Sequence, residues 1–311
     1  MRKRFSERSP LRGRSFDVSS SPWVSVFVPA YNHAPFIEQC LEAILDQVTD
    51  FPIEIIVNDD ASTDETPAIL KSYQQRHPAL FKCHLQKTNL FRAHRRFEGR
   101  LHGLARGVYM AQCDGDDYWR DPDKLQKQVD FLEGHPEYVM SFHDAIEIDV
   151  HGGLLRPHNL PEAARRDYTA DELRCLKWGW MLTQSMVYRK AFDEFPPEYF
   201  LAPNEDNFLP ILLGRFGAAK YQGEVEPLAY RQHPGGIWSQ QSFGRRSQMQ
   251  FQSYLQIVAY LVRIGEKQTA RKLVLGRLIP YLNRYFSAGR KPAAAPQAGA
   301  AAESFRQPER S

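Results

Sequence analysis

Short apolar runs alternate with amphipathic segments over the first half of the chain, and this alternation constrains the fold more than any other feature. The runs are rich in β-branched and aromatic residues, as buried parallel strands are. They lie at residues 24–29, 53–60, 81–86, 107–113 and 138–148. Between them, segments such as residues 35–47 place apolar residues on one helical stripe. Strands that alternate with helices over short connections predict an α/β fold, a mostly parallel, doubly wound sheet flanked by helices.

The second half of the chain has a different pattern, and this sets the domain boundaries. From about Pro157 the alternation weakens, and residues 246–286 carry apolar residues at the spacing of two amphipathic helices. The sequence after Ser287 is rich in Ala and Pro, which predicts disorder. We therefore divide the chain into a basic flexible leader (1–21), an α/β domain (22–240) with a first half (22–143) and a second half (144–240), C-terminal helices (241–286) and a disordered tail (287–311).

The charge and hydropathy of the chain limit its partners. A net charge of +3 is small for 311 residues, so we expect no nucleic-acid partner. The start of the chain lacks the apolar segment of a signal peptide, and no apolar run reaches about 18 residues, so we expect a cytoplasmic protein. The basic leader predicts either a solvated tail or peripheral contact with the inner face of the membrane. Its basic residues are Arg2, Lys3, Arg4, Arg8, Arg12 and Arg14.

Polar residues follow three of the predicted strands at the point where each strand ends. They occupy residues 29–32, 58–60 and 114–117. In open α/β sheets, ligands bind outside the carboxyl ends of the strands, and these ends share one edge of the sheet. We therefore expect the three groups to meet in space and to form the binding site.

The carboxylates of Asp114, Asp116 and Asp117 repel one another unless a positive charge lies among them. The chain has neither the GxGxxG of a dinucleotide site nor the GxxxxGK of a P-loop. A site for Mg²⁺ or Mn²⁺, which takes carboxylates and completes its shell with substrate phosphate, fits the pattern instead. The alternative is an Asp-rich turn before a helix that Asp121 caps, since turns favour Asp on their own.

Three segments of the first half closely resemble the nucleotide-binding half of family 2 glycosyltransferases, which have the A-type glycosyltransferase fold. The segments read VSVFVPAYNHAPFIEQCLEAILDQ, IEIIVNDDASTDET and YMAQCDGDDYW. They stand in the family's order and spacing, over about residues 24–142. The chain departs from the family after the third strand, where Leu90 and Phe91 follow Asn89 in place of the usual x-Gly.

The resemblance implies roles for the acidic residues. In that family the first acidic motif recognises the nucleotide base, which implies Asp59, with Asp60 beside it. The Asp-x-Asp motif binds the ribose and a metal-bound diphosphate, which implies Asp114 for the ribose and Asp116 for Mn²⁺ or Mg²⁺. The implied donor-binding residues are Pro29, Ala30, Tyr31, Asp59, Asp60, Asp114, Asp117 and His233, and the implied metal ligands are Asp116 and His233.

Two segments of the second half extend the resemblance. APNEDNFLPILLGRFG is similar to the family's Glu-Asp motif at the start of an acceptor-side helix, which implies that Asp206 is the catalytic base. YRQHPGGIWS is similar to a loop that closes over the diphosphate, which implies that His233 contacts phosphate or metal. Local structure offers alternatives, because Asn204 or Asp206 could cap a helix and His233 could be an ordinary turn residue.

These patterns predict a metal-dependent glycosyltransferase that moves a sugar from a nucleotide diphosphate-sugar to a hydroxyl group, with inversion. Recognition of the base by an acidic residue suits uracil but leaves thymine and guanine open. The acceptor is expected to be a saccharide or a lipid-linked saccharide, in polysaccharide or glycolipid biosynthesis. Two alternatives remain at this point: a non-catalytic nucleotide-sugar binder or scaffold on the same fold, and a sugar nucleotidyltransferase, although the latter normally has a Gly-rich basic loop after the first strand.

Overall fold

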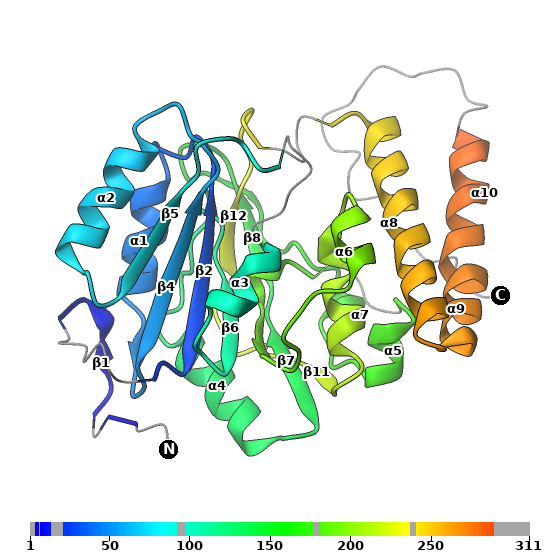
Figure 1. Ribbon diagram of the computed structural model, residues 1–311, viewed down its shortest axis with the longest axis horizontal. Coiled ribbons are helices and arrows are strands. Elements are labelled where there is room, and N and C mark those ends of the chain that lie inside the picture. Colours follow the sequence, from blue (N-terminus) through cyan, green and yellow to red (C-terminus); the bar gives the residue numbers. More distant parts are fainter. Residues whose placement is uncertain are drawn as a thin grey trace.

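A seven-stranded sheet forms the centre of the computed structural model, which describes residues 4–5, 7–13, 21–91, 98–176, 181–236 and 241–288 (Figure 1). Its strands are β2 (Val24–Ala30), β4 (Ile53–Asp59), β5 (Phe81–Leu85), β6 (Tyr109–Gln112), β7 (Tyr138–Phe142), β10 (Val187–Arg189) and β11 (Ala218–Tyr221), in the spatial order β11-β7-β10-β6-β2-β4-β5. Strand β10 is antiparallel to both of its neighbours, and all other pairs are parallel. The prediction of a mostly parallel α/β sheet flanked by helices is confirmed.

Each face of the sheet carries its own hydrophobic core, because successive side chains of a strand point to opposite faces. On β2, Val26 and Val28 point to one core and Phe27 points to the other. The first core is covered by α1 (Ile37–Leu45), α2 (Thr66–Arg76) and α4 (Lys124–Gly134). The second is covered by α3 (Glu98–Leu104), α5 (Ala170–Arg174), α6 (Pro197–Leu201), α7 (Leu209–Leu213), α8 (Phe243–Arg263) and α9 (Lys267–Leu273).

The C-terminal helices form a layer at the end of the molecule away from α1 and α2 (Figure 1). After α9 the chain continues through a π-helical turn (Val274–Leu278) into α10 (Ile279–Ala288). The structure thus has α8 and a second, continuous helical segment where the sequence predicts two helices. None of the helices in the described residues combines the length and the apolar content that crossing a bilayer requires. The predicted disordered tail lies outside the described residues from residue 289 on.

The single strand expected over residues 138–148 is wrong, because the chain changes sheets there. Strand β7 ends at Phe142, and β8 (Ala145–Ile148) joins a second sheet with β9 (Leu154–Arg156) and β12 (Leu228–Arg231). The break falls at Asp144, which is buried and whose carboxylate accepts hydrogen bonds from the amides of Ala145 and Leu160, both at 2.8 Å. This turn brings β12, and the residues that follow it, next to the central sheet.

The leader is not free where the structure describes it, so the expected flexible segment is wrong for residues 7–13. Strand β1 (Ser9–Pro10) pairs with β3 (Val48–Thr49), and Leu11 is 1% exposed. The basic side chains form ion pairs with acidic residues of the α/β domain, which holds the segment in place. The pairs are Arg4 with Asp50 and Asp130, Arg8 with Asp130, and Arg12 with Glu42 and Asp46. Membrane contact through this segment stays a prediction.

Candidate functional site

The three polar groups lie along one edge of the sheet, as the sequence predicts. Strands β4 and β6 flank β2 on its two sides, so the loops after these three strands are neighbours. Hydrogen bonds from backbone amides link the loops, from Asp60 to the carbonyl oxygen of Ala30 (2.9 Å) and from Gly115 to that of Pro29 (3.0 Å). Tyr31, which follows, is half-buried. Pro29, Ala30 and Tyr31, which the resemblance implies for donor binding, thus lie in the middle of the candidate site.

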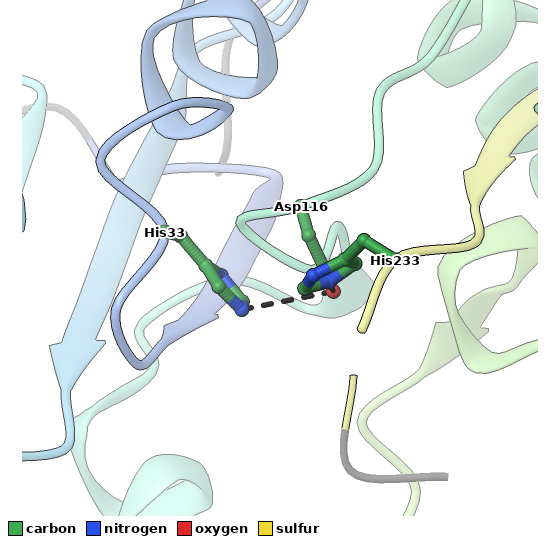
Figure 2. A group of neighbouring side chains, drawn as sticks. All are labelled: His33, Asp116 and His233. Atoms are coloured by element: carbon green, nitrogen blue, oxygen red, sulfur yellow. Dashed lines mark hydrogen bonds and ion pairs between the residues drawn. The ribbon is translucent and has the colours of Figure 1, made fainter. Parts of the chain in front are cut away.

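Asp116 lies between two histidines, and Figure 2 shows the three side chains converging from separate segments. Its Oδ2 is 2.9 Å from Nε2 of His233, which follows β12, and 3.6 Å from Nε2 of His33, in the loop after β2. Burial alone would raise the pKa of Asp116, but the hydrogen bond to His233 and the charge of His33 lower it. Ligand atoms of the three residues all lie within 4.8 Å of one another, which is suitable for holding a metal ion.

Asp117 has a different environment, since it is 2% exposed. Its Oδ1 accepts a hydrogen bond from the amide of Arg231 (2.8 Å), which ties β12 to the Asp-x-Asp loop. Its Oδ2 is buried and has no hydrogen-bond partner among the described residues. Burial and the charges of Asp116 and Asp114 raise the pKa of Asp117 well above its ordinary value. This unsatisfied carboxylate fits a cation nearby, while the contact of Asp117 with the donor stays a prediction.

The side-chain amides of two glutamines orient Asp114. Its carboxylate accepts hydrogen bonds from Nε2 of Gln112 (2.8 Å) and from Nε2 of Gln184. The position of Gln184 is in turn fixed by its backbone carbonyl oxygen, which accepts a hydrogen bond from Nε1 of Trp119 (2.9 Å). Sequence reasoning missed Gln184, because it lies in a stretch, residues 144–184, that matched no chemical pattern.

The carboxylates of Asp59, the last residue of β4, and of Asp60, the first residue of the loop after it, have different partners. Both oxygens of Asp60 accept from backbone amides, those of Leu90 (2.6 Å) and Phe91 (3.1 Å). Asp60 therefore anchors the loop at which the chain departs from the family, and its contact with a base stays a prediction. Asp59 keeps its Oδ1 buried without a hydrogen-bond partner among the described residues, while its Oδ2 accepts from the amide of Ser62 at 3.2 Å.

The loops after β2 and β4 are fastened to each other in strained conformations. Asn32 and Ala61 have φ angles of 54° and 63°, in the left-handed region that residues other than glycine seldom adopt. The amide of Asn32 donates to Oγ of Ser62 (2.8 Å), and Oδ1 of Asn32 accepts from the amide of Thr63 (2.8 Å). Ser62 and Thr63 thus serve the contact between the two loops, and α2 begins only at Thr66.

Asp206 comes from the second half of the chain. It sits in a short 3₁₀ turn (Glu205–Asn207), and α7 begins later, with Phe208 at its N-cap, so Asp206 does not occupy the cap position. Burial raises the pKa of Tyr230 on β12, and the charges of Asp117, Asp116, Asp114 and Asp206 add to this effect. Asp206 and the three aspartates of the Asp-x-Asp loop are thus near enough for their charges to act on the same residue, Tyr230.

Arg231 links the parts of the site and was also missed by sequence reasoning. It is 5% exposed, and its guanidinium donates to the carbonyl oxygens of Asp116 (3.0 Å) and Asp149 (3.2 Å) and to Oε1 of Gln39 (2.6 Å). The alternation of side chains along β12 could have indicated a buried arginine, but the sequence predicts no strand there.

A comparison with protein-family models identifies the family. Residues 25–194 match the model described as Glycosyl transferase family 2. The chain belongs to glycosyl transferase family 2. The match includes the loops after β2, β4 and β6, and it ends before Asp206 and His233.

Relatives of this family 2 chain are found among curated proteins. A protein of Mycobacterium tuberculosis (strain ATCC 25618 / H37Rv), named only as uncharacterized, is 36% identical over 230 residues, which are 72% of this chain and 62% of that protein. The chondroitin synthase of Escherichia coli is 31% identical over 151 residues, 48% of this chain and 21% of the synthase. The chain thus spans less than two thirds of the length of these relatives.

Solved structures show the same fold at low sequence identity. S. aureus TarS 1–349, in complex with UDP-GlcNAc, aligns over 85% of this chain and 72% of its own, with a TM-score of 0.59 and 18% identity. The mannosyltransferase PcManGT from Pyrobaculum calidifontis, in complex with GDP-Man and Mn²⁺, aligns over 94% of this chain and 80% of its own, with a TM-score of 0.55 and 20% identity. The A-type glycosyltransferase fold implied by the sequence is confirmed.

Proposed function

We propose that this family 2 chain transfers a sugar from a nucleotide diphosphate-sugar to a hydroxyl group of a saccharide or lipid-linked saccharide, with inversion and with the help of a divalent cation. The observation that carries the proposal is that the charge of Asp206 acts on Tyr230 together with the charges of Asp114, Asp116 and Asp117. A donor site alone would not need a carboxylate from the second half of the chain beside it. An inverting transferase does need one, because a base must take the proton of the acceptor hydroxyl.

On the donor side, each residue is given the role that its contacts support. Asp59 accepts the imino hydrogen of the base at Oδ1, which has no hydrogen-bond partner among the described residues. Uracil, thymine and guanine all present such a hydrogen, and we favour a UDP-type donor among them. Asp114, held by Gln112 and Gln184, binds the ribose hydroxyls. Asp116 and His233 hold Mn²⁺ or Mg²⁺, which supplies positive charge to the diphosphate leaving group.

On the acceptor side, Asp206 accepts the proton of the attacking hydroxyl as the new glycosidic bond forms, the bond between the anomeric carbon and the diphosphate breaks, and the nucleoside diphosphate leaves. Arg231 holds the Asp-x-Asp loop against β12 through its contacts with Asp116 and Asp117. It thereby helps to orient the donor toward the catalytic base, Asp206. The relatives support a saccharide acceptor, since they include the chondroitin synthase and a protein named as a putative teichuronic acid biosynthesis glycosyltransferase of Bacillus subtilis. The complexes of TarS with UDP-GlcNAc and of PcManGT with GDP-Man and Mn²⁺ support the donor class and the cation.

The test is a thermal-shift series with UDP, TDP, GDP, ADP and CMP, each with Mn²⁺, Mg²⁺ or EDTA. A ligand at about a hundred times its Kd stabilises the folded state by about 2.7 kcal/mol, so a real donor nucleotide raises Tm measurably. We expect one diphosphate to shift Tm, and only with a cation. If no nucleotide shifts Tm under any condition, the donor site is wrong and a non-catalytic scaffold becomes the better interpretation.

The catalytic role of Asp206 needs a separate measurement with the nucleotide sugar whose nucleotide gives the shift. We expect Asp206→Asn to keep the metal-dependent Tm shift and to lose turnover by roughly two to four orders of magnitude, as for loss of a general base. Near-normal turnover of this variant would show that another group accepts the proton.

A further inference from the structure

His33 has an imidazole that the rest of the described chain leaves without a hydrogen bond. Its Nδ1 is buried and has no partner among those residues. Its Nε2 is 3.6 Å from Oδ2 of Asp116, which is too long for a hydrogen bond. The side chain is only 14% exposed. Leaving Nδ1 buried without a partner is costly, which indicates that the ring is held here for the sake of its other nitrogen, Nε2, which faces Asp116.

The ring is held in this position from several sides. A Cβ atom added at Gly115 would lie 2.8 Å from Nδ1 of His33 and 2.7 Å from Cδ1 of Ile37, so the imidazole fits into a space that only glycine leaves open. The backbone amide of His33 donates to Oγ1 of Thr66 (2.9 Å). The orientation of Nε2 toward Asp116, seen in Figure 2, therefore follows from packing.

Two of the three distances within the cluster of His33, Asp116 and His233 match those between ligands of one cation, and the third is at most 4.8 Å. Bonds of about 2.1 Å place ligand atoms about 3.0 Å apart in octahedral geometry and about 3.4 Å apart in tetrahedral geometry. Oδ2 of Asp116 is 2.9 Å from Nε2 of His233 and 3.6 Å from Nε2 of His33. A single cation can therefore contact all three atoms with small adjustments of the side chains.

We propose that His33 is a third protein ligand of this cation site, and that the three residues bind a transition-metal dication such as Mn²⁺, in preference to Mg²⁺, before the nucleotide arrives. The proposal rests on the proposed function, in which Asp116 and His233 hold the cation. It adds a ligand from the loop after β2. The sequence analysis assigned residues 29–32 of this loop to the site but did not include His33.

Ligand chemistry explains the preference. Imidazole nitrogen suits first-row transition ions, whereas Mg²⁺ prefers oxygen ligands and keeps several of its waters. A site with one carboxylate depends on substrate phosphate to hold its ion, but a site with two imidazoles and a carboxylate has three fixed ligands of its own. The free protein should therefore bind Mn²⁺ with no nucleotide present.

The direct test is titration of the metal-free, full-length protein with Mn²⁺ alone, in which electron paramagnetic resonance measures the free ion. We expect one Mn²⁺ per chain, retained in a tenfold excess of Mg²⁺. His33→Gln should weaken Mn²⁺ binding by at least about tenfold, since even the loss of a residue that only supports a metal ligand has such an effect. His151→Gln, which changes an exposed histidine in the turn between β8 and β9, is the matched control and should bind Mn²⁺ as the wild type does.

Each failure has its own meaning. If His33→Gln binds Mn²⁺ as tightly as wild type, His33 is not a ligand, while the site of Asp116 and His233 stands. If Mn²⁺ binds only together with a nucleotide, the three-residue site is wrong but the proposed function survives. A protein that binds neither Mn²⁺ nor any nucleotide contradicts both.

A measurement on the wild type alone tests the proposal even if the His33→Gln variant does not fold. Electron spin echo envelope modulation of bound Mn²⁺ detects the nitrogen nuclei of coordinated imidazoles. We expect two coordinated imidazoles, from His33 and His233. A single coordinated imidazole would overturn the proposal.

Discussion

Two buried carboxylates at opposite ends of the same strand, β4, differ in how the chain treats their charge. Glu54 lies near the start of β4 and is completely surrounded by donors: Oγ of Ser25 (2.6 Å), Nζ of Lys82 (2.7 Å), and the amide (2.7 Å) and Nε (2.9 Å) of Arg106. Asp59 ends the strand and is just as buried, yet its Oδ1 has no hydrogen-bond partner in the described part of the chain.

The pKa values of these two carboxylates move in opposite directions. Burial alone would raise the pKa of Glu54, but the contacts with Lys82, Ser25 and Arg106 lower it below its ordinary value. Burial also raises the pKa of Asp59, and there the hydrogen bond from Ser62 does not compensate. The chain thus neutralises the charge of Glu54 and leaves the charge of Asp59, at the carboxyl edge, without such compensation. Perturbed groups of this kind are typical of functional sites.

The largest effect should come from removing the satisfied carboxylate. Glu54→Ala leaves the amide of Arg106 and the hydroxyl of Ser25 buried without an acceptor, which should lower the free energy of unfolding by about 3 kcal/mol. Lys82 and Arg106 can still reach water, because their side chains are 42% and 41% exposed, so the loss should not be larger. Urea denaturation measures the change, and Glu137→Ala, at an exposed position, is the control. A loss below about 1 kcal/mol would show that the donors around Glu54 do not stabilise it.

Asp59→Asn should have the opposite effect on stability, because it removes a buried charge whose Oδ1 has no hydrogen-bond partner among the described residues. We expect a gain of about 1 kcal/mol in the free energy of unfolding at neutral pH, of the size common for relieved functional sites. Affinity for the donor nucleotide should fall roughly tenfold to a hundredfold, since a hydrogen bond to a charged group contributes about 1.5–3 kcal/mol. Isothermal titration with the nucleotide measures this loss. A variant that is less stable than wild type would mean that Asp59 supports the fold as Glu54 does.

The pH dependence of the two variants should separate them further. The folded-state pKa of Glu54 is lowered from 4.5, so its stabilising effect is complete above pH 4.5 and is lost as pH falls through the folded-state value. The folded-state pKa of Asp59 is raised from 3.8, so its destabilising effect is complete above the folded-state value and disappears as pH falls to 3.8. As the pH falls, the free energy of unfolding of both variants should therefore approach that of the wild type. Glu54→Ala should approach it from lower values and Asp59→Asn from higher values. Urea denaturation between pH 3 and pH 7 checks the two signs, and a gap that widens in acid would contradict them.

Much of the fold could be predicted because its strands are long and apolar, as β2 and β4 are. The short strands β11 and β12 escaped prediction, since four residues such as Leu228–Arg231 carry too little pattern. The three polar groups at the carboxyl edge follow from the same topology. The partners of the carboxylates do not follow from it, because Gln184 and Arg231 reach the site from segments that only tertiary packing brings there.

Backbone strain also marks the carboxyl edge, and Ala61 offers the smallest test of the comparison. Ala61 has a φ of 63°, a conformation that is unfavourable by about 1–2 kcal/mol for a residue with a Cβ atom. Ala61→Gly removes this strain but loosens the unfolded chain, so the net gain in the free energy of unfolding should be about 0.5 kcal/mol. Ala68→Gly, on the exposed face of α2, is the control and should lose about 1 kcal/mol. Equal losses in both variants by urea denaturation would mean that the loop after β4 is not strained. We expect the free energy of unfolding to rise in Ala61→Gly and to fall in Ala68→Gly. This result would show that backbone strain, as well as uncompensated charge, destabilises the carboxyl edge of the sheet.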